Sequence, residues 1–396
     1  MRQYGKIPPT VASLMEGFME TEQVEGKSIM SGHMFFMRHA FALAERCSVK
    51  TSPNPRVGCV IVKAGRIIGE GFTQPVGGNH AEIEALAAAA ALNEDVRGAT
   101  VYVTLEPCSH HGRTPPCTEA LIRAKVGKVV AAMQDPNPQV AGNGFRQLRE
   151  AGIEVLCGVL EQQAREMNLG FLSRVERGRP WVRVKIAASL DGKTALPNGQ
   201  SQWITSEAAR LDGHRWRMKA DAVMTGIGTV LTDNPQLNVR LPEVVRQPIR
   251  IVVDSHLKTP VDAKVLGQGN VWLFAANASP LRIDALKGKG AEVFAAINDT
   301  GRVDLHEMMR VLAEREINEV HVEAGATLSG ALVEAGLVDE LLLYLAPCCL
   351  GRGRDMLGIN ALPSLDDRIA LDIREMTRID GDLRIVARVL DKNRKG

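Results

Sequence analysis

The sequence predicts a two-domain α/β protein. Its length of 396 residues exceeds that of a usual single domain, so each half can bury a core of its own. Short β-branched segments alternate with segments of helical periodicity along most of the chain, which is typical of α/β folds. The basic, breaker-rich segment Arg177-Gly178-Arg179-Pro180 interrupts this alternation. We therefore place the domain boundary there, between a domain of residues 34–178 and a domain of residues 179–396.

Residues 1–33 stand apart from both domains. They are weakly periodic, and Ser31-Gly32-His33-Met34 is typical of a tag remnant or an alternative start. We assign this N-terminal extension or tag no function.

The first domain is expected to alternate helices with strands. Thr51-Ser52-Pro53-Asn54-Pro55 ends its first helix, and the turn Lys63-Ala64-Gly65-Arg66 can join two strands as a hairpin. The expected helices are 36–44, 81–92, 118–124 and 144–151, and the expected strands are 57–62, 67–72, 100–105, 129–132 and 154–156.

The second domain begins with a new strand and repeats the alternation, which implies a mostly parallel sheet. Its expected strands are 181–187, 222–225, 249–253, 271–274, 319–322 and 341–344, and its expected helices are 206–220, 305–315 and 328–335.

The composition excludes several classes of protein. Apolar residues make up 45% and charged residues 24%, as in globular proteins, and the net charge of +2 gives no electrostatic basis for a nucleic-acid partner. No apolar run approaches transmembrane length, and acidic residues interrupt the N-terminus where a signal peptide needs an apolar core. Reduced thiols then fit the seven cysteines better than disulfides do. We therefore expect a cytoplasmic protein that binds neither nucleic acid nor membrane.

The most informative motif is His80-Ala81-Glu82, followed by Pro107-Cys108 and Cys117. One imidazole and two thiolates make a catalytic zinc site that keeps a fourth position for water. Zinc lowers the pKa of bound water toward neutrality and so supplies a hydroxide nucleophile. Glu82 lies two residues after the ligand His80 and can carry protons rather than bind metal, as in base deaminases. The motif therefore predicts a hydrolytic deaminase.

Other interpretations of these residues remain open. Free cysteines are often only small buried hydrophobic residues. A structural zinc would need a fourth protein ligand, which His110 or His111 could supply, but such a site has no use for Glu82. Eight residues separate Cys108 from Cys117 in place of the usual two, which fits a loop before a helix. Both metal-binding segments are expected at helix N-termini, which favour thiolates.

Two turns in the second domain can bind phosphate. Thr225 to Thr229 and Glu323 to Gly330 each follow a predicted strand. Backbone N–H groups at such turns bind phosphate, and two of them at one sheet edge favour a dinucleotide. Neither turn has the G-x-G-x-x-G fingerprint, and an ordinary capping turn explains each equally well. Arg217 and Arg240 could pair with an anionic substrate and Trp203 could stack on a ring, although solvation and core packing are the commoner fates.

Longer motifs resemble the RibD family of bifunctional riboflavin biosynthesis proteins. The metal segment from Thr104 to Cys117, TLEPCSHHGRTPPC, carries the strongest resemblance. The other motifs are Gln134-Asp135-Pro136-Asn137-Pro138, Ala188-Ser189-Leu190-Asp191-Gly192-Lys193, Ser201-Gln202-Trp203-Ile204-Thr205 and Val322-Glu323-Ala324-Gly325. They run in the family's order across nearly all of residues 34–390.

This resemblance implies two consecutive reactions. The N-terminal part resembles a three-layer domain of cytidine-deaminase fold, which would remove the 2-amino group of 2,5-diamino-6-(5-phosphoribosylamino)pyrimidin-4(3H)-one. The C-terminal part resembles a dihydrofolate-reductase-like domain, which would use NADPH to reduce the ribosyl side chain of 5-amino-6-(5-phosphoribosylamino)uracil to ribityl. The implied cofactors are Zn²⁺ and NADPH, and the implied partner is a phosphorylated pyrimidine. The family tends to form homo-oligomers, so a dimer or tetramer is expected.

The resemblance also implies roles for individual residues. In the deaminase, His80, Cys108 and Cys117 would hold zinc, Glu82 would be catalytic, and Asn54, His110 and Arg113 would contact substrate. The implied cofactor-binding residues are Ala187, Trp203, Thr229, Asp233, Ser255, Gly325, Ala326, Thr327, Leu328, Ser329, Gly330 and Ala331. The implied substrate-binding residues of the reductase are Lys185, Ser201, Arg217, Leu237, Arg240 and Glu323.

Other functions fit the sequence less well. A nucleic-acid-editing deaminase would share the zinc ligands but would need a basic surface and closer cysteines. A non-enzymatic scaffold with a degenerate site would have lost Glu82 or a ligand, and all are present. A monofunctional deaminase with an inactive reductase domain is the main alternative, because the reductase assignment depends more heavily on the resemblance.

Overall fold

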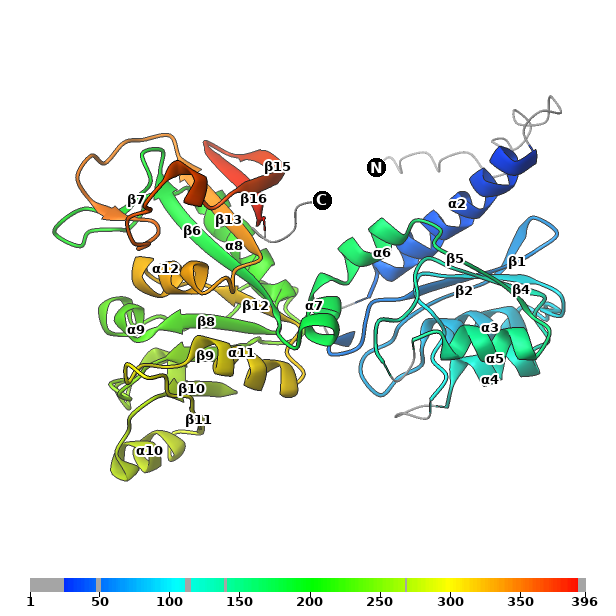
Figure 1. Cartoon of the computed structure of the whole chain (residues 1–396), viewed down its shortest axis with the longest axis horizontal. Helices are drawn as coiled ribbons and strands as arrows, with labels where there is room; N and C mark the ends of the chain where they lie inside the picture. Colours follow the sequence, from blue (N-terminus) through cyan, green and yellow to red (C-terminus); the bar gives the residue numbers. More distant parts are fainter. Residues whose placement is uncertain (1–24, 48–50, 111–114, 139–140, 268, 391–396) are drawn as a thin grey trace, which may run out of the picture.

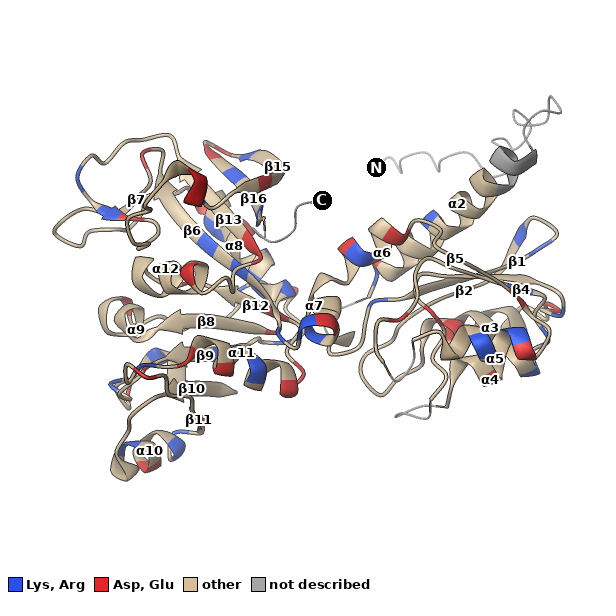
Figure 2. Cartoon of the chain, in the orientation of Figure 1, with Lys and Arg blue, Asp and Glu red and all other residues tan. Residues whose placement is uncertain are grey.

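The protein consists of two lobes, each built around one β-sheet (Figure 1). A computed structural model describes residues 25–47, 51–110, 115–138, 141–267 and 269–390. Within these ranges, no helix combines the length and apolar composition that crossing a membrane requires. Basic and acidic residues are interspersed over both lobes (Figure 2), in keeping with the small net charge of +2. The predicted two-domain α/β class is confirmed.

The first lobe has three layers. Its sheet, in the order β2-β1-β3-β4-β5, contains β1 (Gly58–Lys63), β2 (Arg66–Phe72), β3 (Thr100–Val103), β4 (Lys128–Ala131) and β5 (Glu154–Cys157). Helix α2 (Glu25–Ala44) covers one face, and α3 (Ala81–Ala91), α4 (Cys117–Arg123) and α5 (Asn143–Glu150) cover the other (Figure 1). The predicted hairpin joins β1 to β2, with Lys63 paired to Arg66.

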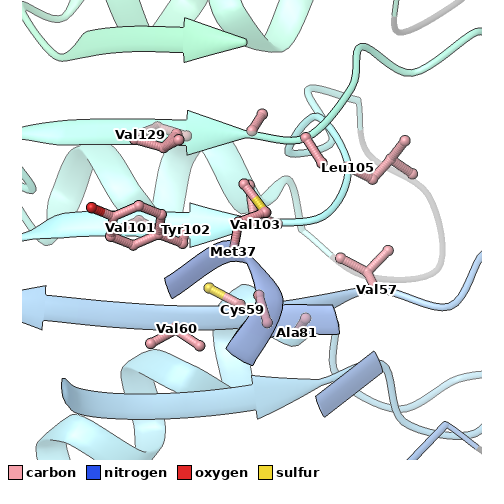
Figure 3. Packing of buried hydrophobic residues seen from close by; sticks show 14 of the residues in the cluster. Met37, Val57, Cys59, Val60, Ala81, Val101, Tyr102, Val103, Leu105 and Val129 are labelled. Carbon is pink, nitrogen blue, oxygen red and sulfur yellow. The ribbon is translucent and has the colours of Figure 1, made fainter. Parts of the chain in front are cut away.

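Glycines in the first sheet let the helices approach closely. A Cβ on Gly58 would lie 1.9 Å from the carbonyl oxygen of Ala40 in α2. A Cβ on Gly71 would lie 2.2 Å from the carbonyl oxygen of Ala81, the first residue of α3. Only glycine fits at these contacts, and the second one lets the N-terminus of α3 lie close against β2. The apolar side chains that fill the space between the layers include Met37, Cys59, Val60, Val101 and Val103 (Figure 3).

The second lobe contains a nine-stranded sheet in the order β11-β10-β9-β8-β12-β6-β13-β16-β15. The strands are β6 (Trp181–Ser189), β8 (Ala222–Gly226), β9 (Ile249–Val253), β10 (Val271–Ala275), β11 (Ala291–Ala295), β12 (Glu319–Val322), β13 (Glu340–Ala346), β15 (Leu371–Ile379) and β16 (Asp382–Val389). The strands from β11 to β13 run parallel, which confirms the predicted parallel sheet. Strands β16 and β15 extend it antiparallel, and no prediction covered them.

Helices cover both faces of this sheet. They are α8 (Glu207–Lys219), α9 (Ile227–Asp233), α10 (Pro280–Lys287), α11 (Leu305–Glu314) and α12 (Ala326–Glu334). Adjacent β8 residues point to opposite faces, so Met224 packs with Leu312 of α11, whereas Val223 packs in the core that contains Leu286 of α10. A small sheet of β7 (Lys193–Ala195) and β14 (Arg354–Asp355) lies beside this arrangement.

Two predicted turns are partly helical, so those predictions were wrong in part. Helix α9 begins at Ile227 and α12 begins at Ala326, inside the segments predicted as turns. Gly226 and Gly325 are the N-cap residues of these helices. The Gly and Thr residues of these segments fit the first turn of a helix, because its N–H groups have no intrahelical partner.

Two short helices, α6 (Glu161–Met167) and α7 (Leu169–Arg177), lie between the lobes (Figure 1). Gly178 ends α7 in a left-handed conformation with φ of 65°, at the predicted domain boundary. Helix α2 crosses the other predicted boundary, between residues 33 and 34, and Nδ1 of His33 lies 2.9 Å from the Tyr102 hydroxyl. Residues 1–24 of the predicted extension lie outside the described ranges.

Candidate active sites

The three predicted zinc ligands lie together at the starts of two helices. His80 is the N-cap residue of α3, Cys117 is the first residue of α4, and Cys108 lies in the loop after β3. His80 Nδ1 is 3.5 Å from Cys108 Sγ and 3.4 Å from Cys117 Sγ. Tetrahedral zinc with usual bond lengths separates a nitrogen and a sulfur ligand by about 3.6 Å. The three donors therefore fit Zn²⁺.

Hydrogen bonds within this cluster favour a thiolate at Cys108. The Cys117 thiol and its backbone N–H, 3.3 Å from Cys108 Sγ, lower the pKa of Cys108, and His80 lowers it further. The same thiol–thiol hydrogen bond, together with burial, raises the pKa of Cys117. Because thiolates are the metal-binding form, one ligand is already stabilised in the form that zinc requires.

Glu82 lies beside the ligands in the first turn of α3 and is 4% exposed. Burial raises the pKa of its carboxyl group to about 7, and Cys108 adds to this rise while His80 opposes it. A bound cation would oppose the rise as well. A buried carboxyl group of this kind can accept and return a proton within the pocket.

A cavity of about 340 Å³ opens in front of these groups. Among its lining residues are the predicted Asn54 and His110 together with His80, Glu82 and Cys108. The predicted Arg113 lies outside the described residues. Of its described predicted residues, the first domain thus brings all except Cys117 to the lining of one cavity, and Cys117 lies beside His80 behind that lining.

Other residues that line the cavity received no role from the sequence. Asp135 and Asn137 come from the loop after β4, and burial raises the pKa of Asp135 to about 6. Their motif was recognised, but nothing in it indicated which side chains face the cavity. Arg174 comes from α7 and Glu316 from the segment before β12, so neither carries a local signal for a deaminase.

Glu106 is a buried residue in the wall of the cavity and holds the loop after β4 in place. Its carboxylate accepts hydrogen bonds from the backbone N–H groups of Asp135 at 3.1 Å, Gly142 at 3.0 Å and Phe145 at 3.2 Å. Because Glu106 lies two residues before Cys108, these bonds join the metal-binding loop to the loop that carries Asp135.

The second domain gathers charged side chains near the carboxyl end of β12. Glu323 follows that strand directly, and its Oε1 accepts a hydrogen bond from Arg217 Nε at 2.7 Å. Burial alone would raise the pKa of Glu323, but Arg217, His321 and Lys185 together hold it well below its usual value. Burial lowers the pKa of Lys185 in β6, and Glu323 opposes this change. The predicted Lys185, Arg217 and Glu323 therefore form one electrostatic cluster.

His214 belongs to the same cluster, and no sequence signal pointed to it. Burial, Arg217 and Arg240 lower its pKa to about 4, so its imidazole is neutral at pH 7. The backbone N–H of Arg240 lies 3.4 Å from His214 Nδ1. Leu237, three residues before Arg240, is buried and has a left-handed φ of 52°.

Several predicted cofactor-binding residues follow neighbouring parallel strands. Thr229 lies in α9 after β8, and its Oγ1 is 4.0 Å from where a Cβ on Gly325 would lie. Ser255 follows β9, and its Oγ accepts a hydrogen bond from the Val303 backbone N–H at 3.2 Å. Ala187 lies near the end of β6. Carboxyl ends of parallel strands are where α/β sheets bind nucleotides.

The remaining predicted residues of this domain lie in varied surroundings. Trp203 is 69% exposed, and the Arg210 guanidinium lies 4.3 Å from its ring centroid. Ser201 lies in the same segment, and the exposed Asp233 ends α9. Gly330 is buried in α12, where a Cβ would lie 2.2 Å from the carbonyl oxygen of Gly358. The other residues of α12 that were predicted to bind cofactor are Ala326, Thr327, Leu328, Ser329 and Ala331.

Family comparisons match both domains. The family described as "RibD C-terminal domain" matches residues 180–385. The family described as "Cytidine and deoxycytidylate deaminase zinc-binding region" matches residues 30–133. The chain is 47% identical over 348 residues to riboflavin biosynthesis protein RibD of Escherichia coli K12, with 84% of this chain and 92% of that protein covered. It is 43% identical over 358 residues to RibD of Bacillus amyloliquefaciens, with 89% and 95% covered.

Solved structures show the same likeness. Acinetobacter baumannii RibD, form 1, superposes with a TM-score of 0.84 at 41% identity, covering 91% of this chain and 100% of that one. A Thermotoga maritima protein superposes with a TM-score of 0.80 at 35% identity, covering 91% and 99%. The latter is described as a diaminohydroxyphosphoribosylaminopyrimidine deaminase/5-amino-6-(5-phosphoribosylamino)uracil reductase.

Proposed function

The chain belongs to the RibD family of bifunctional riboflavin biosynthesis proteins, and from this premise we propose how its residues carry out the two reactions. It is a deaminase and reductase with a His-Cys-Cys zinc-site triad, and it has the expected cytidine-deaminase-like and dihydrofolate-reductase-like domains. We assign deamination to residues 34–178 and reduction to residues 179–396.

The deaminase acts on 2,5-diamino-6-(5-phosphoribosylamino)pyrimidin-4(3H)-one. His80, Cys108 and Cys117 would hold Zn²⁺, which would lower the pKa of water at the site. Glu82 accepts a proton from the attacking water and returns protons to the ring nitrogen and the leaving amine. Asn54 and His110, which line the same cavity, orient the pyrimidine, and Arg113 contacts the phosphate. The approach of His80 Nδ1 to both thiols, at 3.5 and 3.4 Å, is the observation that carries this assignment.

The reductase acts on the deaminated product, 5-amino-6-(5-phosphoribosylamino)uracil. The domain implies a nicotinamide cofactor, and we propose that this is NADPH, which supplies the hydride. Lys185, Arg217 and Glu323 bind and orient the substrate beside the carboxyl end of β12, with Ser201, Leu237 and Arg240 around them. The predicted residues after β6, β8, β9 and β12 hold the cofactor, in keeping with the usual place of nucleotides in such sheets.

We also propose that the protein forms a homodimer or homotetramer in the cytoplasm. Strand β15 is at the edge of the larger sheet, and it exposes Leu371, Ile373 and Met376 at 41%, 56% and 57%. An edge strand with exposed apolar side chains is a site for pairing with another chain. The seven free cysteines support a reducing compartment.

A two-stage assay on purified, zinc-loaded protein tests both assignments. Ammonia release is measured with the diaminopyrimidine substrate, and NADPH absorbance is followed after the cofactor is added. Ammonia release followed by NADPH oxidation is the expected result. Ammonia release without NADPH oxidation would favour the alternative, a monofunctional deaminase with an inactive reductase domain. Absence of ammonia with zinc bound would overturn the substrate assignment.

A further inference from the structure

The cavity of the deaminase has a wall that the reductase domain and helix α7, which lies between the lobes, help to form. Arg174 of α7 and Glu316, which precedes β12 in the reductase sheet, both line it beside Pro53 and Asn54. Acidic and basic residues gather on α7 where the lobes meet (Figure 2). The reductase domain is therefore in direct contact with the substrate cavity of the other domain.

Three hydrogen bonds hold Pro53 and its neighbour from this side. Asn318 Nδ2 donates to the carbonyl oxygen of Pro53 at 3.1 Å and to Ser52 Oγ at 3.3 Å. Arg174 Nη2 donates to the same carbonyl oxygen at 3.2 Å. Arg174 Nε also donates to Asn318 Oδ1 at 2.6 Å, so the two side chains that hold Pro53 hold each other as well.

Asn318 is itself fixed to the reductase sheet. Its side chain is 7% exposed, its backbone N–H donates to Asp221 Oδ2 at 2.9 Å, and its carbonyl oxygen accepts from the Trp181 N–H at 2.8 Å. A Cβ on Gly170 of α7 would lie 2.8 Å from that carbonyl oxygen, so the linker helix also packs closely against this point. The side-chain amide of Asn318 thus has a defined position relative to both lobes.

Asn168, at the junction of α6 and α7, holds the other end of the segment from Ser52 to Arg56. Asn168 accepts a hydrogen bond from the Arg56 N–H at 2.8 Å and donates to the Arg56 carbonyl oxygen at 3.0 Å. Asn54 lies between the two points of attachment, and its own N–H bonds to the Thr51 carbonyl oxygen at 2.9 Å. Hydrogen bonds therefore hold the backbone on both sides of Asn54, and Asn54 itself lines the cavity.

We propose that Asn318 and Arg174 are positioning residues of the deaminase reaction. They set the place of Asn54 in the cavity, and this inference rests on the proposed deaminase function and on the assignment of Asn54 to the substrate. A misplacement of about 1 Å in a substrate-orienting group can cost about 100-fold in kcat/KM. Because Asn54 binds substrate and does not transfer the proton, the effect falls on KM rather than on kcat.

The first test is Asn318→Asp in the full-length, zinc-loaded protein. Aspartate keeps the shape and the acceptor for Arg174, but it puts an oxygen where Nδ2 donates to Pro53. We expect KM for ammonia release to rise about tenfold or more, with kcat within about twofold of wild type. Zinc content and NADPH oxidation with the deaminated substrate stay unchanged, because Asn318 precedes β12 and Glu323 follows it.

A matched control separates positioning from general docking of the lobes. Glu166→Gln weakens the ion pairs of α6 with Arg388 and Arg374 of the reductase sheet. Those pairs do not touch residues 52–56, so the inference requires KM to stay at the wild-type value. Arg174→Gln should raise KM as Asn318→Asp does, and Arg174→Lys should restore much of it because lysine can still donate to Pro53.

The outcomes are distinct. A wild-type enzyme that releases no ammonia defeats the proposed function itself. A wild-type enzyme that is active, with unchanged KM in Asn318→Asp and Arg174→Gln, overturns the positioning role. An equal rise of KM in Glu166→Gln also overturns it, because loose docking would then explain the effect. If Asn318→Asp loses zinc, the test rests on the Arg174 variants, and an unchanged KM in Arg174→Gln then overturns the positioning role.

Discussion

The two sites of this protein balance charge in opposite ways. The deaminase site collects two thiols and a buried carboxyl group around His80, and its negative charge is suited to a divalent cation. The proposed reductase site contains its own cations, since Glu323 forms an ion pair with Arg217 and Lys185 also lowers its pKa. Substitution in the first site should therefore remove a chemical step, whereas substitution in the second should disturb the orientation of substrate.

The largest effect is expected for Glu82→Gln. Glutamine keeps the size of the side chain but cannot carry a proton, so ammonia release should fall roughly 100- to 10,000-fold. NADPH oxidation with the deaminated substrate should be unchanged, and zinc content should match wild type. Glu84→Gln, on the same helix, is the control and should retain full activity. A loss of less than about tenfold in Glu82→Gln would show that another group carries the proton.

The next effect is expected for Glu323→Gln. The substitution leaves Arg217 and Lys185 without their anion, and removal of one partner from a largely desolvated pair costs about 2 kcal/mol here. We expect kcat/KM of NADPH oxidation to fall about 30-fold, mostly through KM, because 1.4 kcal/mol corresponds to tenfold. Ammonia release serves as the internal control. Exposed Glu314→Gln should have no effect, and an unchanged KM in Glu323→Gln would place the substrate elsewhere.

A smaller effect, on stability, is expected for Glu106→Gln. The glutamine amide keeps one oxygen acceptor, but its NH₂ group would face backbone N–H groups that donate to the Glu106 carboxylate. We expect this to lower the free energy of unfolding of the first domain by about 2 kcal/mol. All four tryptophans, Trp181, Trp203, Trp216 and Trp272, lie in the second domain. Zinc release during urea unfolding therefore reports on the first domain, and tryptophan fluorescence reports on the second.

Only the zinc-release midpoint should shift to lower urea in Glu106→Gln. The control is Glu150→Gln, which removes the ion pair of an exposed glutamate with Arg146. It should leave the free energy of unfolding of the first domain within about 0.5 kcal/mol of wild type. An equal shift of the fluorescence transition would mean that the lobes unfold as one unit.

The smallest effect is a pH dependence from His214. Burial, Arg217 and Arg240 lower its folded-state pKa to about 4, below the usual value of 6.5. Between these values the unfolded chain binds more protons, so the second domain loses stability as pH falls from about 6.5 toward 4. After allowance for partial solvent exposure, the loss between pH 7 and pH 5 should be about 1 kcal/mol. His214→Gln should show a smaller loss by urea unfolding followed by tryptophan fluorescence, and an equal loss would assign the effect to other groups.

The zinc site could be predicted from sequence because its chemistry is local. His80 and Cys117 begin helices, and the spacing of residue types predicted the three ligands that the structure brings together, with Glu82 in the first turn of α3. The strands of both sheets could be predicted largely from their β-branched segments. The C-terminal hairpin of β15 and β16 has mixed polarity and received no prediction.

Contacts between distant segments could not be predicted in this way. The reductase cluster joins Lys185, Arg217 and Glu323 from three elements, and only the family resemblance brought them together in advance. Nothing near Asn318 indicates that its side chain reaches Pro53, 265 residues earlier. His214 acquires its low pKa only from neighbours that the fold supplies. Such properties depend on topology, which residue spacing does not encode.

Strand β12 starts at the wall of the deaminase cavity and ends at the charged cluster of Lys185, Arg217 and Glu323, with Asn318 before it and Glu323 after it. The deaminase cavity therefore depends on residues of both domains. A gene split at residue 178 would yield a deaminase polypeptide without Asn318 and Glu316. Lineages that separate the two activities into different genes would have to supply that wall from new sequence or keep the two polypeptides associated.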